Sequence, residues 1–177
     1  MSNEIIRISN IAKEHQKVDT VMYALNKENL KKYAKQIAGN KAVGIDKITK
    51  KEYVANLDNN IDKLIINMKK MAYKPKAVRR VYIPKPGSEK KRPLGIPAFE
   101  DKIVQMGMTE ILNAIYEPMF KKFSFGFRLG KSCHQAISYL KKMTEIKYVN
   151  YIVDLDIKGF FDNIEHEWLI KFLEYRI

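Results

Sequence analysis

The sequence holds one cysteine, Cys133, so the chain cannot form an internal disulfide bond. It also lacks any run of about 18 apolar residues, which excludes a membrane-spanning helix of ordinary length. Its first residues, MSNEIIRISN, do not have the basic and then apolar pattern of a secretory signal. We therefore expect a cytoplasmic protein in a reducing compartment.

Acidic residues are scarce relative to basic ones: 20 Asp and Glu stand against 33 Lys and Arg, a net charge of +13. The excess is concentrated between Lys69 and Arg92, where ten basic residues face one acidic residue, Glu89. Clustered cations are what neutralisation of a nucleic-acid backbone requires. A solvated basic surface is the alternative. A DNA-binding regulator is disfavoured, because no recognition helix or zinc-ligand spacing is present.

The first third of the chain is predicted to be helical. Residues 1–20 are weakly patterned and are expected to form a loosely held extension. A helix is predicted from about Lys27 to Ala38, followed by a turn at 44–46. Thr49 and Glu52 fit a capping box, which predicts one helix running to about Ala72. Its expected core positions have helical spacing: Tyr53, Leu57, Ile61, Leu64, Ile65 and Met68.

A β-hairpin is predicted next. Residues 78–84 alternate between two faces, a turn follows at 86–89, and a second short strand is expected at 92–97. The prolines in both strands suit an edge better than the centre of a sheet. The hairpin lies within the basic cluster, so its surface is expected to be strongly positive.

The second half mixes helix and strand. A helix is predicted at 99–116, ended by Pro118, and a second capping box at Ser132–Gln135 opens another helix in which Cys133 falls on an apolar stripe. Residues 148–155 are predicted to be a buried strand. A last helix follows, and it is still apolar where the sequence stops, so we expect the chain to be truncated within a larger fold. The whole is a mixed α/β (α+β) layout.

Asp156 is the leading candidate for chemistry. In a strand at 148–155, Ile152, Asp154 and Asp156 would share one face, with Asp156 at the carboxyl end. A carboxylate there can bind Mg²⁺, and phosphoryl-transfer sites often hold two such metals. One aspartate cannot hold two metals, so more carboxylates would be needed. The alternative is that Asp156 caps the following helix; Asp162 is interpreted as a cap or an ion-pair partner.

Four segments in order carry a family resemblance. Asp156-Ile-Lys-Gly-Phe-Phe-Asp-Asn-Ile-Glu-His resembles the first catalytic motif of the group II intron-encoded reverse transcriptases and maturases. Residues 79–87 with 91–97 are similar to their fingers hairpin, and Gly44-Ile-Asp46 to the turn before their long fingers helix. Ser124-Phe-Gly-Phe-Arg-Leu-Gly-Lys-Ser132 resembles a loop in which the family usually has Tyr and Pro where this chain has Phe125 and Leu129.

The resemblance implies the fingers and partial palm of a right-hand polymerase, cut after the first catalytic strand. Residues 1–98 would be the N-terminal extension and fingers, and residues 99–177 the fingers and palm segment with the catalytic aspartate. The family's Tyr-x-Asp-Asp motif is absent from this sequence. The resemblance therefore implies an RNA-directed DNA polymerase whose two-metal Mg²⁺ site is incomplete here, and this chain is expected to be inactive by itself.

Residue roles follow from the same resemblance. Asp156 would be the catalytic, metal-binding aspartate, with the carbonyl of Ile157 as a further ligand. Phe160 and Phe161 would lie at the nucleotide, Phe161 as a wall beneath the sugar, unless both simply pack in a core. Lys85 and Arg92 would contact the triphosphate, unless they belong to a generic basic rim. The residues expected to contact nucleic acid are Lys69, Lys70, Arg79, Arg80, Lys90, Lys91 and Arg128. For Arg128 the alternative is that its loop packs against the palm.

The implied partners are an RNA template, a DNA primer and deoxynucleoside triphosphates. The competing function is an RNA-binding maturase module that grips its intron RNA without catalysis by this segment. The two readings differ at Asp156 and Phe161, because binding RNA needs neither a metal-binding carboxylate nor a wall beneath a sugar.

Overall fold

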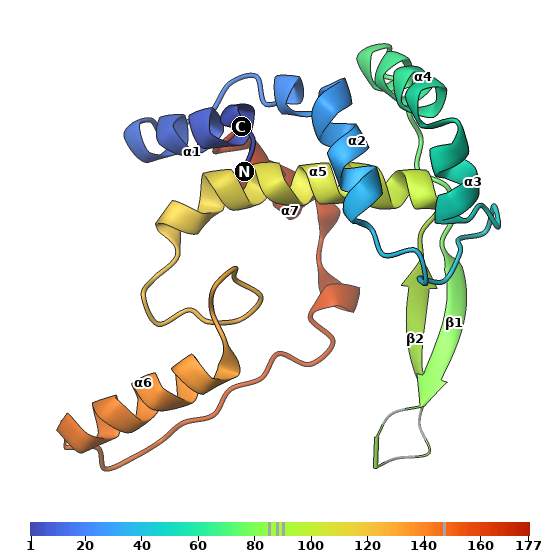
Figure 1. Cartoon of the computed structure of the whole chain (residues 1–177). Helices are drawn as coiled ribbons and strands as arrows, with labels where there is room; N and C mark the ends of the chain where they lie inside the picture. The colour runs from blue at the N-terminus through green and yellow to red at the C-terminus, as the bar shows by residue number, and fades with distance from the viewer. Residues whose placement is uncertain (85, 88, 90, 147) are drawn as a thin grey trace.

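The computed structural model describes residues 1–84, 86, 87, 89, 91–146 and 148–177. Its central element is the long helix α5 (Phe99–Tyr116), against which α1 (Asn3–Glu14) and α2 (Lys27–Gln36) pack (Figure 1). Helix α4 (Leu57–Lys69) packs on α2 and completes a helical layer. With a two-stranded sheet beside these helices, the fold is mixed α and β, as predicted.

The N-terminal residues are not the loosely held extension that was expected. Ile5, Ile8 and Ala12 are buried on one face of α1, and this helix makes the most extensive helix–helix contact with α5 in the described chain. A spacing of three and four residues places these side chains on one stripe, but a stripe this narrow is informative only once a partner helix is known. A short 3₁₀ helix, η1 (Met22–Ala24), leads from there toward α2.

The capping box at Thr49 is confirmed, whereas the single long helix behind it is wrong. The backbone breaks at Asn56 (φ −120°, ψ 38°), which separates α3 (Lys50–Ala55) from α4. The side-chain amide of Asn60 donates a 2.9 Å hydrogen bond to the carbonyl of Tyr53, an acceptor that a continuous helix would have used internally. The break turns α4 so that its predicted apolar positions still reach the core.

The predicted hairpin is confirmed to within one residue at each strand end. Strand β1 (Arg79–Pro84) pairs antiparallel with β2 (Lys91–Ile96), and the two strands form the whole of this sheet. The hairpin projects from the end of α5, on the side opposite α3 and α4 (Figure 1). A two-stranded sheet is marginally stable alone, so its position depends on what holds its base.

The last third departs most from expectation. Helix α6 (Cys133–Ile146) begins with the predicted capping box, in which Ser132 and Gln135 exchange hydrogen bonds, but Cys133 is exposed rather than packed in a core. Residues 148–157 are extended and exposed and form no strand, so the predicted buried strand is wrong. A strand exists only where its backbone finds a partner, and no described segment pairs with this one.

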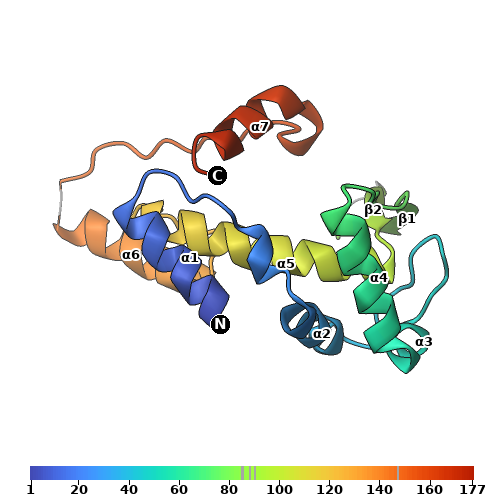
Figure 2. The same ribbon diagram turned by 90° about the horizontal axis from the view of Figure 1, so that it is seen from above.

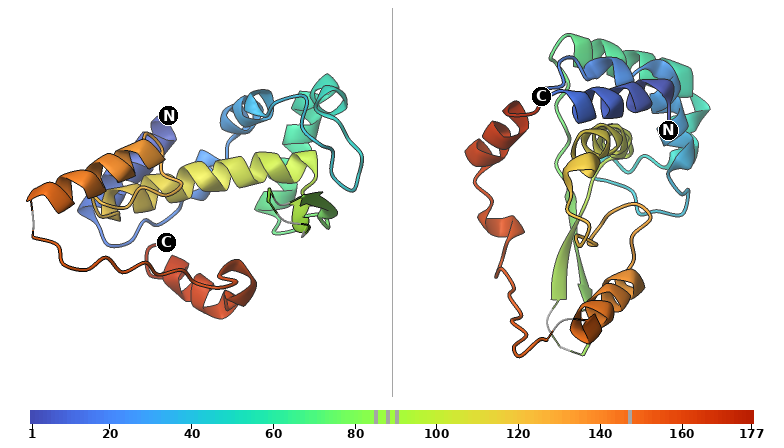
Figure 3. Two further views of the ribbon diagram at one scale, coloured as in Figure 1. Left: turned by 90° about the horizontal axis from the view of Figure 1, so that it is seen from below. Right: turned by 90° about the vertical axis from the view of Figure 1, so that its left-hand side faces the viewer.

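The chain then returns to the helical layer. After 3₁₀ helix η3 (Phe161–Asn163), helix α7 (His166–Glu174) lies on the opposite side of α5 from α2 (Figure 2). Its end is fastened to the turn after α1, where the Val18 amide donates to the Arg176 carbonyl at 2.8 Å. The hairpin and the segment between α6 and α7 both lie on the side of α5 away from α1–α4 (Figures 1 and 3).

The core contains residues from both sides of position 98, for example Leu30 and Tyr33 with Ile103 and Ile115. The division of the chain after residue 98 stays a prediction. Within the described ranges, no helix has the length and apolar character needed to cross a membrane.

Candidate functional site

Asp156 lies in the exposed segment that leads from α6 to η3. It does not cap a helix: Phe160 occupies the N-cap position of η3 and Glu165 that of α7. The alternative interpretation of Asp156 as a helix cap is therefore wrong, and among the described residues no helix terminus donates a hydrogen bond to its carboxylate. Asp162 lies inside η3 rather than at a cap, and it has no ion-pair partner among the described residues.

A turn at Gly159 determines where the chain goes after Asp156. Gly159 has a φ of +63°, a left-handed conformation that glycine adopts without steric cost. Its carbonyl accepts a 2.7 Å hydrogen bond from the side chain of Asn163 and a 3.1 Å bond from the Asp162 amide. This local ring of hydrogen bonds orders the turn although no strand precedes it, and it places the two phenylalanines immediately after the aspartate.

The two phenylalanines face different surroundings. Their rings meet edge to face with centroids 5.3 Å apart. Phe161 is 83% exposed, so it does not belong to a core in this structure, whereas Phe160 is 50% exposed. Phe160 also borders an apolar hollow against α7, together with Ile157, Ile164, Trp168, Leu169 and Phe172. Core packing therefore does not account for Phe161.

The oxygen donors near the turn suit Mg²⁺ in kind but not in number. The Asp156 carboxylate and the Ile157 carbonyl are ligands that this hard cation accepts. Among the described residues, however, no three acidic, histidine or cysteine side chains gather as a metal site would require. The segment thus offers the carboxylates of Asp154 and Asp156, and the remaining ligands of a two-metal site would have to come from elsewhere.

The hairpin separates its basic residues onto two faces. The register pairs Ile83 with Arg92, and Pro84 with Lys91. Because cross-strand partners share a face, Arg92 lies on the face of Val81 and Leu94, and Lys91 lies on the face of Arg80 and Tyr82. Within the described chain, no carboxylate lies at ion-pair distance from Arg80, Lys91 or Arg92. Lys85 and Lys90 lie outside the described residues.

Three other predicted contacts are placed differently. Lys69 and Lys70 are exposed at the end of α4, away from the strands. Arg79 is half-buried and donates two hydrogen bonds, of 3.0 and 2.9 Å, to the carbonyl of Val43. Its guanidinium thus fastens the loop before α3 to the first residue of β1. A contact between these residues and nucleic acid stays a prediction.

Arg128 has a packing role in the loop after α5. Its guanidinium donates to the Glu117 carboxylate, with a shortest distance of 2.6 Å, and to the carbonyls of Lys121 and Ser124. It also lies over the ring of Phe120, 4.9 Å from the centroid. The hydrogen bond from Arg128 holds the pKa of Glu117 below its usual value. Arg128 thus holds its own loop against the end of α5, while packing of the loop against the palm and contact with the template both stay predictions.

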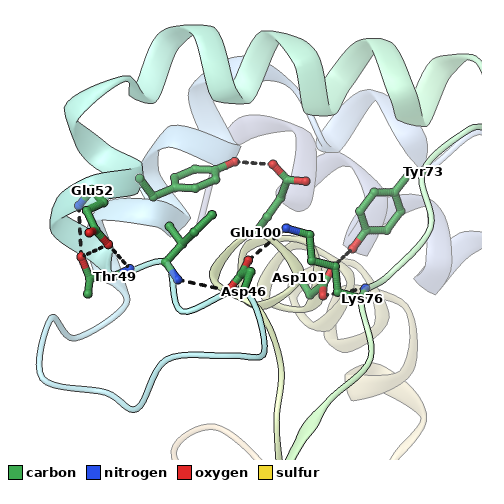
Figure 4. Close-up of polar contacts among 9 residues, drawn as sticks. Asp46, Thr49, Glu52, Tyr73, Lys76, Glu100 and Asp101 are labelled. Carbon is green, nitrogen blue, oxygen red and sulfur yellow. Dashed lines mark hydrogen bonds and ion pairs between the residues drawn. The ribbon is translucent and has the colours of Figure 1, made fainter.

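A polar cluster that sequence reasoning missed holds the base of the hairpin (Figure 4). Asp101, in the first turn of α5, is 3% exposed. Its carboxylate accepts a 2.5 Å hydrogen bond from the Tyr73 hydroxyl and a 3.0 Å bond from the Lys76 amide. Burial, and then the bond to Asp101, raise the pKa of the Tyr73 hydroxyl. The Lys76 ammonium in turn pairs with Asp46 at 3.0 Å.

The loop before α3 is held at the same place by backbone contacts. A Cβ on Gly44 would lie 2.6 Å from the Cα of Ala98, so this close approach requires glycine. Lys102 donates to the Ala42 carbonyl at 2.7 Å, and burial lowers the pKa of its ammonium group. The sequence indicated the turn at 44–46 but gave no sign that it packs against the end of β2.

Comparison with known proteins adds the family. The family model described as reverse transcriptase (RNA-dependent DNA polymerase) matches residues 83–176, slightly more than half of the chain. This chain belongs to the reverse transcriptase family. The matched region of this reverse transcriptase segment runs from the end of β1 through α7 and includes the Asp156 turn.

Several of its relatives are named as proteins encoded in introns, in agreement with the predicted group II intron branch. The chain is 45% identical over 120 residues to the group II intron-encoded protein LtrA of Lactococcus lactis subsp. cremoris, covering 68% of this chain and 20% of LtrA. It is 36% identical over 137 residues to protein YkfC of Escherichia coli, covering 76% of this chain and 36% of YkfC.

A third relative covers more of the chain. The identity to the COX1/OXI3 intron 2 protein of Saccharomyces cerevisiae is 36% over 157 residues, which is 89% of this chain and 17% of that protein. The chain therefore spans a fifth to about a third of the length of the first relatives it matches. The N-terminal helices lie outside the family model, and an alignment over 89% of the chain must include part of them.

Proposed function

We propose that this chain forms the fingers and the first part of the palm of an RNA-directed DNA polymerase of the group II intron type. The observation that carries the proposal is spatial. The basic hairpin and the segment bearing Asp156 lie on the same side of α5, away from α1–α4 (Figures 1 and 3). A nucleotide and a template strand bound on that side would meet cations from the hairpin and a carboxylate from the palm segment.

The hairpin supplies the phosphate contacts. Arg92 carries a planar guanidinium that can grip two phosphate oxygens at once, and it has no carboxylate partner in the described chain. It is assigned to the triphosphate of the incoming deoxynucleotide, with Lys85 as a second contact. Arg80 and Lys91, on the other face with Tyr82, are assigned to the template backbone, since a ring beside two cations suits a single strand.

The palm segment supplies the sugar and metal contacts. Phe161, exposed and held one turn after Asp156, is assigned as the wall beneath the sugar, where it would clash with a ribose 2′-hydroxyl. Asp156 is assigned as one ligand of Mg²⁺, with the Ile157 carbonyl beside it. Bound metal would stabilise the charge that develops on the transferred phosphate. The further carboxylates of a two-metal site would come from a segment other than the one that carries Asp156.

The alternative function is an RNA-binding module that grips an intron RNA without catalysis by this segment. The name of the relative LtrA, an intron-encoded protein, is compatible with either function. The two functions differ at Asp156, because an interface that only holds phosphates does not need a carboxylate at this position. Neutralising Asp156 should therefore separate catalysis from binding.

The experiment is primer extension by a longer protein that contains this chain and is comparable in length to its relatives. Asp156→Asn should abolish extension while leaving RNA affinity equal to or slightly above that of the unmodified protein. Asn keeps the shape but lacks the charge that would hold the metal. Asp162→Asn, six residues away with the same change in charge, is the matched control and should retain extension. Full extension by Asp156→Asn would contradict the catalytic assignment.

A further inference from the structure

Within the described residues, no third strand pairs with the hairpin, so its direction is determined at its base. The sheet consists of β1 and β2 alone. Two paired strands without a third strand or a covering helix are marginally stable in water. Any cationic side chain on these strands can therefore be held in place only if something fixes the residues that enter β1 and leave β2.

One buried carboxylate links the residues that follow the hairpin to those that precede it. Asp101 follows β2 by five residues, and its two oxygens are used by the segment that precedes β1: Oδ1 by the Tyr73 hydroxyl and Oδ2 by the Lys76 amide. At 3% exposure the carboxylate has little access to water, so losing either donor would leave a buried charge less well compensated.

The contacts of Asp101 extend to a third segment. Lys76 bridges from this carboxylate to Asp46, whose side chain is 12% exposed and whose other oxygen accepts the Ile48 amide at 3.2 Å. Arg79 and Lys102 bond to the carbonyls of Val43 and Ala42. The loop 42–48, the entry to β1 and the exit from β2 are thus joined into one unit (Figure 4).

We infer that Asp101 is a positioning residue: through Tyr73 and Lys76 it fixes the direction of the hairpin and so holds the hairpin cations where they contact nucleic acid. The inference rests on the proposed function for its consequence in binding, but the ordering of the hairpin can be measured by itself. Asp101 touches neither substrate nor metal in this assignment, and its effect on binding is exerted wholly through β1 and β2.

The expected change in RNA affinity on Asp101→Asn is opposite in sign to the change expected from the lost charge alone. Removing a negative charge from a basic protein should tighten RNA binding. An asparagine, however, cannot accept two hydrogen bonds with the geometry of a carboxylate, so the segment at 73–76 should loosen. If the hairpin then loses about two phosphate contacts, affinity for a single-stranded oligoribonucleotide should fall about tenfold near 0.15 M salt. Asp58→Asn on α4, an exposed aspartate paired with Lys31, is the matched control and should bind RNA equally or more tightly.

The salt dependence distinguishes positioning from a general loss of folding. Loss of two phosphate contacts should reduce the slope of log K against log salt by about 1.4 on single strands. A folding defect would instead lower the fraction of protein able to bind and leave the slope unchanged. Tyr73→Phe, which removes one of the two donors and keeps the ring, should give an intermediate affinity and slope. An unchanged slope for Asp101→Asn with weaker binding would overturn the inference.

Hydrogen exchange of the hairpin amides provides the second readout. In Asp101→Asn the amides of Val81 and Leu94 should exchange faster while those of Ile103 and Ile111 in α5 keep their rates. Equal rates in the hairpin of the unmodified and Asp101→Asn proteins would overturn the inference whatever the RNA affinity. The combined variant Arg80→Gln, Lys91→Gln tests the proposed function separately: if it binds RNA as well as the unmodified chain, the hairpin is not the nucleic-acid contact, and exchange alone decides the role of Asp101.

Discussion

The guanidinium of Arg176 donates a 2.9 Å hydrogen bond to the carbonyl of Ala12, which joins the residues just after α7 to the last turn of α1 across nearly the whole chain. Arg176 is 7% exposed, and its own carbonyl accepts the Val18 amide. A cation at the carboxyl end of a helix also suits the helix dipole. The N-terminal helix therefore helps to position the element that follows the Asp156 turn.

Arg176→Met should destabilise the chain. Methionine can fill the space of the apolar stem but donates no hydrogen bond, so buried carbonyls at the end of α1 lose their partner. The free energy of unfolding should fall by about 1–3 kcal/mol, measured by urea denaturation. Arg80→Met, at an exposed position on the hairpin, is the control and should leave the midpoint unchanged. Equal midpoints for both variants would show that the Arg176 contact contributes nothing to stability.

The isolated chain should bind single-stranded RNA with a strong dependence on salt. The basic cluster from Lys69 to Arg92 is largely exposed, and with about five phosphate contacts the slope of log K against log salt should be about −3.5. Fluorescence anisotropy with a labelled oligoribonucleotide between low and moderate salt measures this slope. A flat response would contradict a role for the cluster in neutralising phosphates.

The isolated chain should show no primer extension. Among its described residues, no three acidic, histidine or cysteine side chains gather at the Asp156 turn, whereas a two-metal site needs carboxylates from a second segment. A template–primer assay with Mg²⁺ and purified chain checks this, with a complete reverse transcriptase as the positive control. Extension by the isolated chain would mean that the metal ligands lie elsewhere in its sequence.

Phe161→Ala, in a longer protein that extends primers, should increase the use of ribonucleotides. Removing the ring would open the space beneath the sugar, so the ratio of ribonucleotide to deoxynucleotide incorporation should rise while extension persists. Phe123→Ala, an exposed phenylalanine in the loop after α5, is the control and should leave the ratio unchanged. A Phe161→Ala protein that unfolds would instead favour the packing role.

Elements whose signals are local were predictable. The capping boxes at Thr49 and Ser132 rest on residues three apart, and the hairpin on alternation and turn residues, so neither needs a distant partner. Helix α5 was predicted with its observed bounds because its apolar spacing and the following Pro118 act within the element itself.

Elements whose conformation depends on distant partners could not be predicted from the sequence. The residues of α1 were expected to be loosely held because residues 1–20 are weakly patterned, but the helix packs because α5 offers a matching face. Residues 148–155 were judged a strand because they are apolar and alternate, and they pair with no described segment because a ladder needs a second backbone. Cys133 was predicted to lie in a core because it falls on an apolar stripe of its helix, but its side chain is exposed.

The features of the candidate site also separate into those that residue types predict and those that depend on contacts between distant segments. Residue types alone predict which side chains would carry its chemistry, because charge and side-chain type do not depend on the fold. These are the carboxylate of Asp156, the ring of Phe161 and the cations of the hairpin, and their roles stay a prediction. The tertiary structure alone decided that Asp156 caps no helix, that Arg128 is engaged by Glu117, and that Asp101 and Tyr73 hold the hairpin. The contact of Arg128 with Glu117 joins residues 11 positions apart in the chain, and that of Asp101 with Tyr73 joins residues 28 positions apart. Such pairs form only when packing has brought their segments together.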